Sequence, residues 1–591
     1  MKFNINIGLL ALFSMLFSCN DNDFLTENPE TFYTIDNIFT TSSQVEQVVT
    51  SCYEQVRYIY CPQETWDLDF YAYCLGNGTD MYDVATIRLA NRFNDYSILN
   101  SETKGFYSVY SAFYQLINIA NTALMAADLD NIVWASEEEK AQVIAEARFF
   151  RAFAYRNLGE LYGGVPIVTE LATEPRYDYA RSTRLETYQF AIDELEACLE
   201  DLPETTAEAG RLVQAAAQHN LCQLYIDKGV ILSEEGGGDA NAAYNKAIEY
   251  ANAVIDGGLY SLMTERFGTR ATENPTFYYA SSDAEQTEDH LYETAGYKIE
   301  GNVFWDLFQV GNQDYQVGNR ESIWAIQFDY DVYKQEGSKG TIYAGYYCPV
   351  FRDQGGEFAT GSMEDVGGLG TCAVQPTFYT RDLIYEGKWN VDMRNSDAVF
   401  RRTILGNVPG TEYYGKLLPW SVLYREDASG QKNDVATTQL YPISCKVGPD
   451  YYVGIEDGEN RSHIFRDHYL IRLPETILLR AEAKLRLGDL QSAANDINLL
   501  RERAQCEYKV TASDMSIDLI LDERARELVY EESRWNTLLR MGGTVAVDRI
   551  KKYSYWDYPR TTLNKTFNLW PIPQTVIDTN KDVKLEQNPG W

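Results

Sequence analysis

Apolar residues recur at helical spacing over much of the first 260 residues and again near the other end of the chain. Between residues 103 and 128, for example, they follow the three- and four-residue steps of one helix face. Ser136, followed by three glutamates, is a typical helix cap, and the helix it starts runs through Ala141 to Tyr162, before two glycines. The same reasoning predicts further helices over residues 42–59, 103–128, 185–199, 212–228, 241–255, 469–487, 490–503 and 517–540.

These helices form pairs that are separated by short glycine breaks. Two breaks, at residues 238–243 and 488–494, have Gly-Asp followed by small residues and then a helix, a local feature of tetratricopeptide-like repeats. Stacked repeats bury a shared core, so even a long chain of this kind can form one domain. The pattern predicts a mainly α fold, with a tetratricopeptide-like helical-repeat scaffold.

The helical periodicity fades between Tyr260 and Ile464, where glycine, asparagine, aspartate and aromatic residues dominate. Residues 322–328 have the composition of a buried strand, and residues 355–370 that of a loop. Long irregular stretches inside a compact domain are usually functional or disordered, and the aromatic content favours order and function here. We therefore expect a large, loop-rich insertion that contains short strands.

Charge excludes one class of partner. The chain has 51 Lys and Arg residues against 87 Asp and Glu residues, a net charge of −36. Such a body repels phosphate backbones, so nucleic-acid binding is not expected, whereas neutral or cationic ligands remain possible. Acidity that only keeps a surface protein soluble is the simpler alternative.

Tyrosine is unusually abundant, with 44 residues against 25 Phe and 10 Trp. Tyrosine combines a flat apolar face with a hydroxyl at its edge. This combination suits sugars, but it suits any other amphipathic interface as well.

No catalytic, metal or cofactor motif stands out. The chain contains neither a GxSxG elbow, a P-loop, a CxxC pair nor an HExxH helix, and it has only four histidines. Gly368-x-Gly370-x-x-Ala373 imitates a dinucleotide fingerprint, but Pro376 prevents the helix that would receive a pyrophosphate. Paired acids such as Asp67 and Asp69 are expected by chance among 87 acidic residues. We therefore expect no enzyme and no cofactor. No metal site is predicted, because none of the acidic loops has the spacing of a calcium site, but the sequence does not decide whether Ca²⁺ supports one of these loops.

The first 19 residues predict an acylation site. Lys2 precedes an apolar run from Ile5 to Phe17, which is too short to span a bilayer, and Ser18 is a small residue directly before Cys19. Bacterial lipoproteins are processed at such a junction, and lipid is attached to the cysteine. Residues 1–18 then form the signal peptide and residues 19–35 a lipidated, acidic leader. In the alternative, an ordinary secreted protein, Cys19 would form a disulfide.

Nine further cysteines remain. Cys52, Cys61 and Cys74 are close enough in sequence for one pair to form a disulfide in an oxidising compartment. The sequence does not decide which pair, if any, is bridged. The other cysteines are expected to be small buried residues.

Several motifs, in order along nearly the whole chain, resemble the SusD/RagB family of outer-membrane nutrient-binding lipoproteins. They are Ala145–Phe153 with Leu161–Ile167, Gly210-Arg211 with Ala215-Ala216, Tyr469–Glu475 with Leu479–Ala483, Glu523–Leu528 with Glu532-x-Arg534-Trp535, Leu569–Pro573, and Gln587–Trp591. In physical terms these motifs are mostly scaffold, and the charged residues from Glu523 to Arg534 are expected to pair across helices.

The resemblance implies one domain over residues 36–591. Its helical scaffold covers about 36–260 and 463–545, its ligand-binding region about 261–462, and its tail 546–591. It also implies a lipid-anchored location on the surface of the cell outer membrane. The partner it implies is a SusC-like TonB-dependent transporter, over which the protein lies as a lid. Relatives of this kind bind oligosaccharides or polysaccharides, or in some cases peptides, and pass them inward without cleaving them.

Binding surfaces in the family use aromatic and polar residues from the loop after the first helix and from the irregular middle region. In this chain the candidates are Trp66, Asn77, Asp80, Tyr82, Arg88, Trp305, Tyr330, Tyr346 and Trp389, with Tyr343, Tyr347 and Trp420 as further aromatic residues. The function expected from the sequence is glycan binding and delivery. A RagB-like peptide-binding protein is the main alternative, and a scaffold without a ligand of its own is another.

Overall fold

The computed structural model describes most of the chain after its first 37 residues. The described residues are 38–61, 75–84, 93, 95–172, 174–275, 299–332, 340–349, 372–405, 417–419, 441–448, 464–554, 561–565 and 567–591. Cys19, Cys74 and the predicted loop 355–370 lie outside them.

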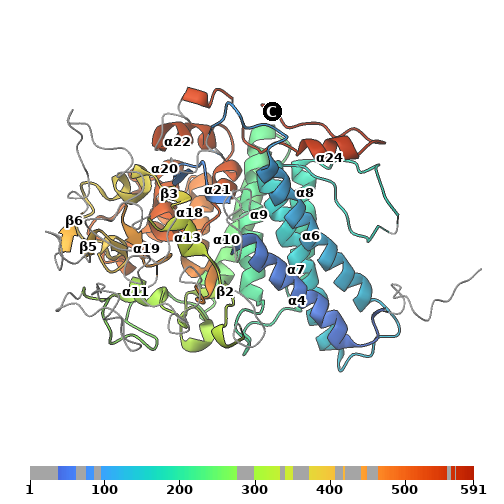
Figure 1. Ribbon diagram of the computed structural model, residues 1–591, viewed down its shortest axis with the longest axis horizontal. Helices are drawn as coiled ribbons and strands as arrows, with labels where there is room; N and C mark the ends of the chain where they lie inside the picture. Colours follow the sequence, from blue (N-terminus) through green and yellow to red (C-terminus); the bar gives the residue numbers. More distant parts are fainter. Residues whose placement is uncertain are drawn as a thin grey trace, which may run out of the picture.

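The N-terminal helices lie side by side, in sequence order (Figure 1). They are α4 (Ser42–Tyr60), α6 (Lys104–Ala127), α7 (Glu137–Tyr162), α8 (Arg184–Cys198), α9 (Gln214–Glu235) and α10 (Ala240–Ile255). All six were predicted from the periodicity. Their ends follow ordinary capping chemistry, since the Ser136 side chain accepts a hydrogen bond from Glu139 N and Gly236 ends α9 with a φ of 70°.

The C-terminal helices join this array through α18 (Leu473–Arg486), which packs against α9 and α10. The same helix also contacts α19 (Leu490–Arg503) and α20 (Ile517–Leu528). They are followed by α21 (Arg534–Arg540), α22 (Val545–Tyr553) and α24 (Gln574–Thr579). The mainly α fold is therefore confirmed. None of the helices in the described ranges is long and apolar enough to cross a bilayer.

Two helix predictions need correction. Residues 468–472 form strand β8, and the helix begins only at Leu473, with Pro474 in its first turn, because proline fits that position and no interior one. Residues 517–540 are not one helix, because the chain leaves α20 after Leu528 and Tyr530 adopts a left-handed backbone with a φ of 64°.

Short antiparallel strand pairs and short helices make up the described parts of the middle region. The predicted strand is β2 (Ser322–Ile326), buried throughout and paired with β8. The other pairs are β1 (Tyr82–Val84) with β3 (Val374–Pro376), β4 (Phe400–Arg401) with β7 (Ile443–Ser444), and β5 (Thr403–Leu405) with β6 (Leu417–Pro419). The short helices include α11 (Val303–Leu307), α13 (Tyr343–Tyr347) and α15 (Phe378–Arg381).

Buried ion pairs connect α20 to the surrounding elements. Glu523 contacts Arg394 at 2.8 Å and Arg501 at 2.7 Å, and Glu527 contacts Arg472 at 3.4 Å. Each of these five side chains is almost fully enclosed, so its charge depends on its partner. The predicted pairing of the charged residues after Glu523 is confirmed.

The hydrophobic core runs through the array and includes Cys52 and Cys61. Both are buried free thiols, and burial raises their pKa values well above that of an ordinary cysteine. In this structure these two cysteines do not form a disulfide with each other.

Candidate functional site

Three residues expected at a functional site, Cys19, Trp66 and Arg88, lie outside the described residues, as does Trp420. They remain predictions. The other candidates can be placed, and most of them lie in the interior.

Asp80 is a structural residue. Its carboxylate contacts the guanidinium groups of Arg534 and Arg549, both at 2.7 Å, and is fully buried. Burial raises its pKa, but the two arginines outweigh burial and hold the pKa at about 2. Neighbouring Asn77 is also buried, and its carbonyl accepts a hydrogen bond from Trp535 Nε1 at 2.7 Å. We therefore correct the prediction for both residues: they fix the 76–80 turn to the C-terminal helices and do not face a ligand.

Most of the aromatic candidates are also enclosed. Trp305 is completely buried, Trp389 lies with its ring 3.7 Å from the Arg526 guanidinium carbon, and the Tyr82 hydroxyl accepts a hydrogen bond from Tyr530 N. Tyr346 and Tyr347 are buried as well, while Tyr330 and Tyr343 are half-buried. Tyr82, Trp305, Tyr346 and Trp389 were candidate ligand-binding residues, and we correct this prediction, because rings that fill the core cannot stack on a sugar.

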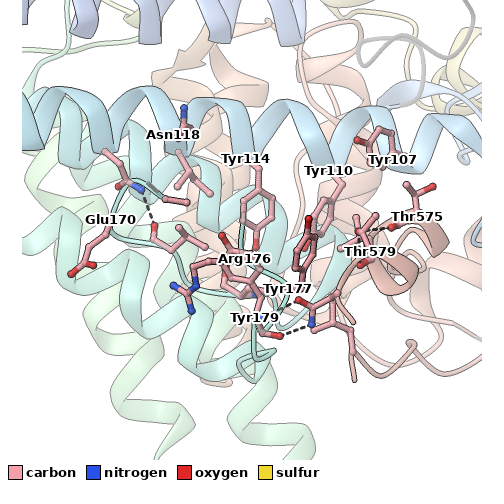
Figure 2. Close-up of a pocket in the computed structure, with 18 residues that line it drawn as sticks. Tyr107, Tyr110, Tyr114, Asn118, Glu170, Arg176, Tyr177, Tyr179, Thr575 and Thr579 are labelled. Atoms are coloured by element: carbon pink, nitrogen blue, oxygen red, sulfur yellow. Dashed lines mark hydrogen bonds between the residues drawn. The ribbon is translucent and has the colours of Figure 1, made fainter. Parts of the chain in front are cut away.

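An open groove of about 410 Å³ lies elsewhere, between helix α6, helix α24 and the segment after α7 (Figure 2). We call the described residues of that segment, 166–172 and 174–179, the strap. The volume falls within the range of about 300–1,000 Å³ that is usual for small-ligand sites. The lining residues are Tyr107, Tyr110, Tyr114, Ile117, Asn118, Asn121, Pro166, Val168, Glu170, Ala172, Arg176, Tyr177, Tyr179, Thr575, Val576, Thr579, Asn580 and Leu585.

Hydrogen bonds hold the first part of the strap against α6. Tyr114 Oη donates to the Pro166 carbonyl at 2.7 Å, and Asn121 Nδ2 donates to the Val168 carbonyl at 3.0 Å. The Val168 amide in turn donates to Tyr155 Oη at 2.6 Å. Buried and half-buried side chains of two long helices therefore fix this wall of the groove.

The last part of the strap is held by the C-terminal segment. The Asn580 side chain accepts a hydrogen bond from Tyr179 N and donates one to Tyr179 O, both at 2.9 Å. The Asp582 amide donates to the Tyr177 carbonyl at 2.9 Å. Segments about 400 residues apart in sequence thus form one preorganised groove.

Five tyrosines dominate the lining, and they differ in exposure. Tyr107 and Tyr177 are 42% and 44% exposed, whereas Tyr110 is only 5% exposed. The rings of Tyr110 and Tyr114 lie 4.8 Å apart. Figure 2 shows both side chains projecting from α6 toward the strap, where Tyr177 and Tyr179 lie. The groove therefore has aromatic rings on two walls. On the strap, the Arg176 guanidinium carbon lies 4.9 Å from the centre of the Tyr179 ring, and Lys581 Nζ lies 5.4 Å from that of Tyr177.

The groove is almost free of charge. Glu170 and Arg176 are its two charged lining residues, and Arg176 contacts Asp178 at 3.0 Å. Burial raises the pKa of Tyr110 to about 12 and that of Tyr114 well above its usual value, so both hydroxyls stay protonated at neutral pH. Within the described residues, Tyr107 and Tyr177 make no hydrogen bond through their hydroxyl groups, so these are available to a ligand.

This arrangement can hold a neutral ligand that has an apolar face and many hydroxyl groups. Within the described residues, no group of three or more His, Cys, Asp or Glu side chains could hold a metal ion. These residues were not among the candidates predicted from the sequence, which came from the loop after the first helix and from the middle region. A signal was present, since tyrosines recur at 107, 110 and 114 at the spacing of one helix face, with Asn118 one turn further on.

Two family models match the chain. The model of the SusD family matches residues 320–591, and a model described as "Starch-binding associating with outer membrane" matches residues 23–226. Together they leave only the region between the two matches and the first residues uncovered.

Individual proteins agree with these models. Starch-binding protein SusD of Bacteroides thetaiotaomicron is 26% identical over 490 residues, which cover 78% of this chain and 75% of that protein. The crystal structure of a SusD homologue from the same organism has a TM-score of 0.65 at 16% identity and covers 94% of this chain and 98% of its own. Surface glycan-binding protein A of Bacteroides thetaiotaomicron, in complex with laminarihexaose, has a TM-score of 0.59 at 17% identity and covers 93% of this chain and 100% of its own.

Proposed function

Because this chain belongs to the SusD family, we propose that it binds oligosaccharides or polysaccharides at the cell surface and delivers them to a SusC-like TonB-dependent transporter. The role is binding without bond cleavage. In this proposal Cys19 carries the lipid that anchors the protein to the outer membrane, and the acidic residues after it form the tether.

The observation that carries the proposal is the groove between α6, the strap and α24. Sugars present C–H faces that pack on aromatic rings and hydroxyl groups that need hydrogen-bond partners. The groove supplies both, with five tyrosines and the exposed amide of Asn118 in its lining. Its walls are held by hydrogen bonds, so little ordering is needed when a ligand binds.

The RagB-like alternative, a peptide-binding protein, fits the lining less well. An extended peptide chain carries backbone donors and acceptors and, in most sequences, charged side chains. The single acidic lining residue, Glu170, and the paired Arg176 provide few partners for such charges. Neutral sugars require none of these partners.

Isothermal titration of the purified protein tests the proposal. The panel contains starch and laminarihexaose, which relatives bind according to their names, together with other neutral glycans and a set of peptides. We expect heat from at least one glycan and no release of products. Binding to peptides with no response to any glycan would overturn the proposal in favour of the peptide alternative.

A further inference from the structure

A second hollow of about 530 Å³ adjoins the groove on the same helix. It shares Tyr107, Tyr110, Tyr114, Asn118 and Val576 with the groove, and Gln55 of α4 and Gln115 of α6 line its other side. The row of tyrosines on α6 is therefore a common wall of the two hollows.

The second hollow has no charged residue in its described lining. This is notable in a chain with 87 acidic residues against 51 basic ones. A charged ligand would lose water here without gaining a partner, whereas a neutral polar ligand would not.

Amide groups supply the polar contacts of the second hollow. Gln55 Nε2 donates to the Ala112 carbonyl at 3.0 Å and to Gln115 Oε1 at 3.3 Å. Among the described residues, Gln115 Nε2 makes no hydrogen bond. Asn118 is exposed, and no hydrogen bond joins its side chain to another described residue. Amides both donate and accept, as sugar hydroxyls do.

The shared wall is long enough for more than one sugar ring. Residues 107, 110, 114 and 118 follow the three- and four-residue steps of one helix face. At a rise of about 1.5 Å per residue, positions 107 and 118 lie ~16 Å apart along the helix. A wall of this length offers contacts to more than one sugar ring.

We propose that the two hollows form one track for a neutral oligosaccharide chain, in which the second hollow is a distal subsite. This rests on the proposed function of the groove. A short oligosaccharide occupies the groove alone, while a longer one crosses Tyr110 and Tyr114 and reaches Gln115. The ligand class is thus an uncharged glycan chain bound along several of its units.

The test uses the Gln115→Leu variant, because Gln115 is exposed and lines only the second hollow. Gln491→Leu, also at an exposed helical glutamine but on α19, is the matched control. Both variants and the unmodified protein are titrated with laminari-, malto-, xylo- and manno-oligosaccharides of two to six units, and with uronic-acid oligosaccharides of the same lengths.

With the best-bound neutral series, we expect Gln115→Leu to weaken the six-unit ligand about fivefold, the effect of losing one hydrogen bond. The two-unit ligand and the control variant are expected to match the unmodified protein. An equal loss at every length, no loss at any length, or tighter binding of uronic-acid chains would overturn the track. Binding of no oligosaccharide by the unmodified protein would instead reject the proposed function itself.

Discussion

Replacing Asp80 by Asn removes the carboxylate that Arg534 and Arg549 share. The pKa of Asp80 falls from 3.8 to about 2 in the folded protein. At about 1.36 kcal/mol per pKa unit, this shift corresponds to about 2 kcal/mol of folding stability at neutral pH. Breaking one partner of a buried pair costs about 3–5 kcal/mol. Because Glu532 and Asp522 still contact the two arginines, we expect the lower end, about 3 kcal/mol.

Thermal unfolding measures this loss. An unfolding entropy of about 2.1 cal/mol/K per residue over 591 residues gives ~1.2 kcal/mol/K, so the midpoint is expected to fall by about 2–3 °C. Asp397→Asn, at an exposed aspartate, is the matched control and should leave the midpoint unchanged.

The contribution of Asp80 to folding stability depends on pH, and the direction of this dependence follows from its pKa. The folded-state pKa of Asp80 is depressed, so its contribution is present above about pH 4 and is lost as the pH falls toward 2. The difference in unfolding midpoint between the unmodified protein and Asp80→Asn should therefore become smaller below pH 4. A midpoint within 0.5 °C of the unmodified protein at neutral pH, or a loss of glycan affinity without loss of stability, would refute the structural role of Asp80.

Three further predictions concern other parts of the molecule. Gly164→Ala should lower both the unfolding midpoint and the glycan affinity, because the added Cβ would lie 1.8 Å from the Ser182 carbonyl oxygen, next to the strap. The control Gly237→Ala, at a position surrounded by open space, should change neither quantity. His219 is buried beside Thr476, and burial lowers its pKa to about 4, so its neutral form stabilises the fold above about pH 6.5 and this contribution is lost as the pH falls toward 4. Unfolding midpoints measured between about pH 6.5 and 4 should therefore fall less steeply for His219→Gln than for the unmodified protein. An equal slope in both proteins would contradict this assignment. Cys19→Ala should release the protein from the membrane fraction of its cells while the glycan affinity in solution stays the same, and retention in that fraction would exclude the proposed anchor.

The helices could be predicted from the sequence because local signals agree with the tertiary packing. Ser136 caps α7, Gly163 follows its last residue, and α19 has the predicted bounds of 490–503. Predictions from local sequence are wrong where contacts between distant segments determine the structure. Residues 468–472 form a strand because β2 pairs with them, and Tyr530 interrupts a helical pattern because it packs among Tyr82 and Tyr347.

The candidate site was harder to predict. Composition shows that tyrosine is abundant but does not separate rings in the core, such as Tyr82, from rings at the surface, such as Tyr107. One wall of the groove is held in place by Asn580, about 400 residues away in sequence, and no local pattern contains that contact. The motifs behind the family resemblance describe the scaffold, so they identify the fold without locating the ligand.

The central claim is that the tyrosine groove binds glycan. Its most direct test is a titration of the best-bound neutral oligosaccharide into the unmodified protein, the double variant Tyr107→Ala/Tyr177→Ala, and the control Tyr58→Ala, whose tyrosine is equally exposed but lies outside the groove. Loss of two aromatic contacts of about 0.5–1.5 kcal/mol each predicts binding roughly tenfold weaker or worse for the double variant. The control should match the unmodified protein. Equal affinity in all three proteins would contradict the account and place the glycan elsewhere on the molecule.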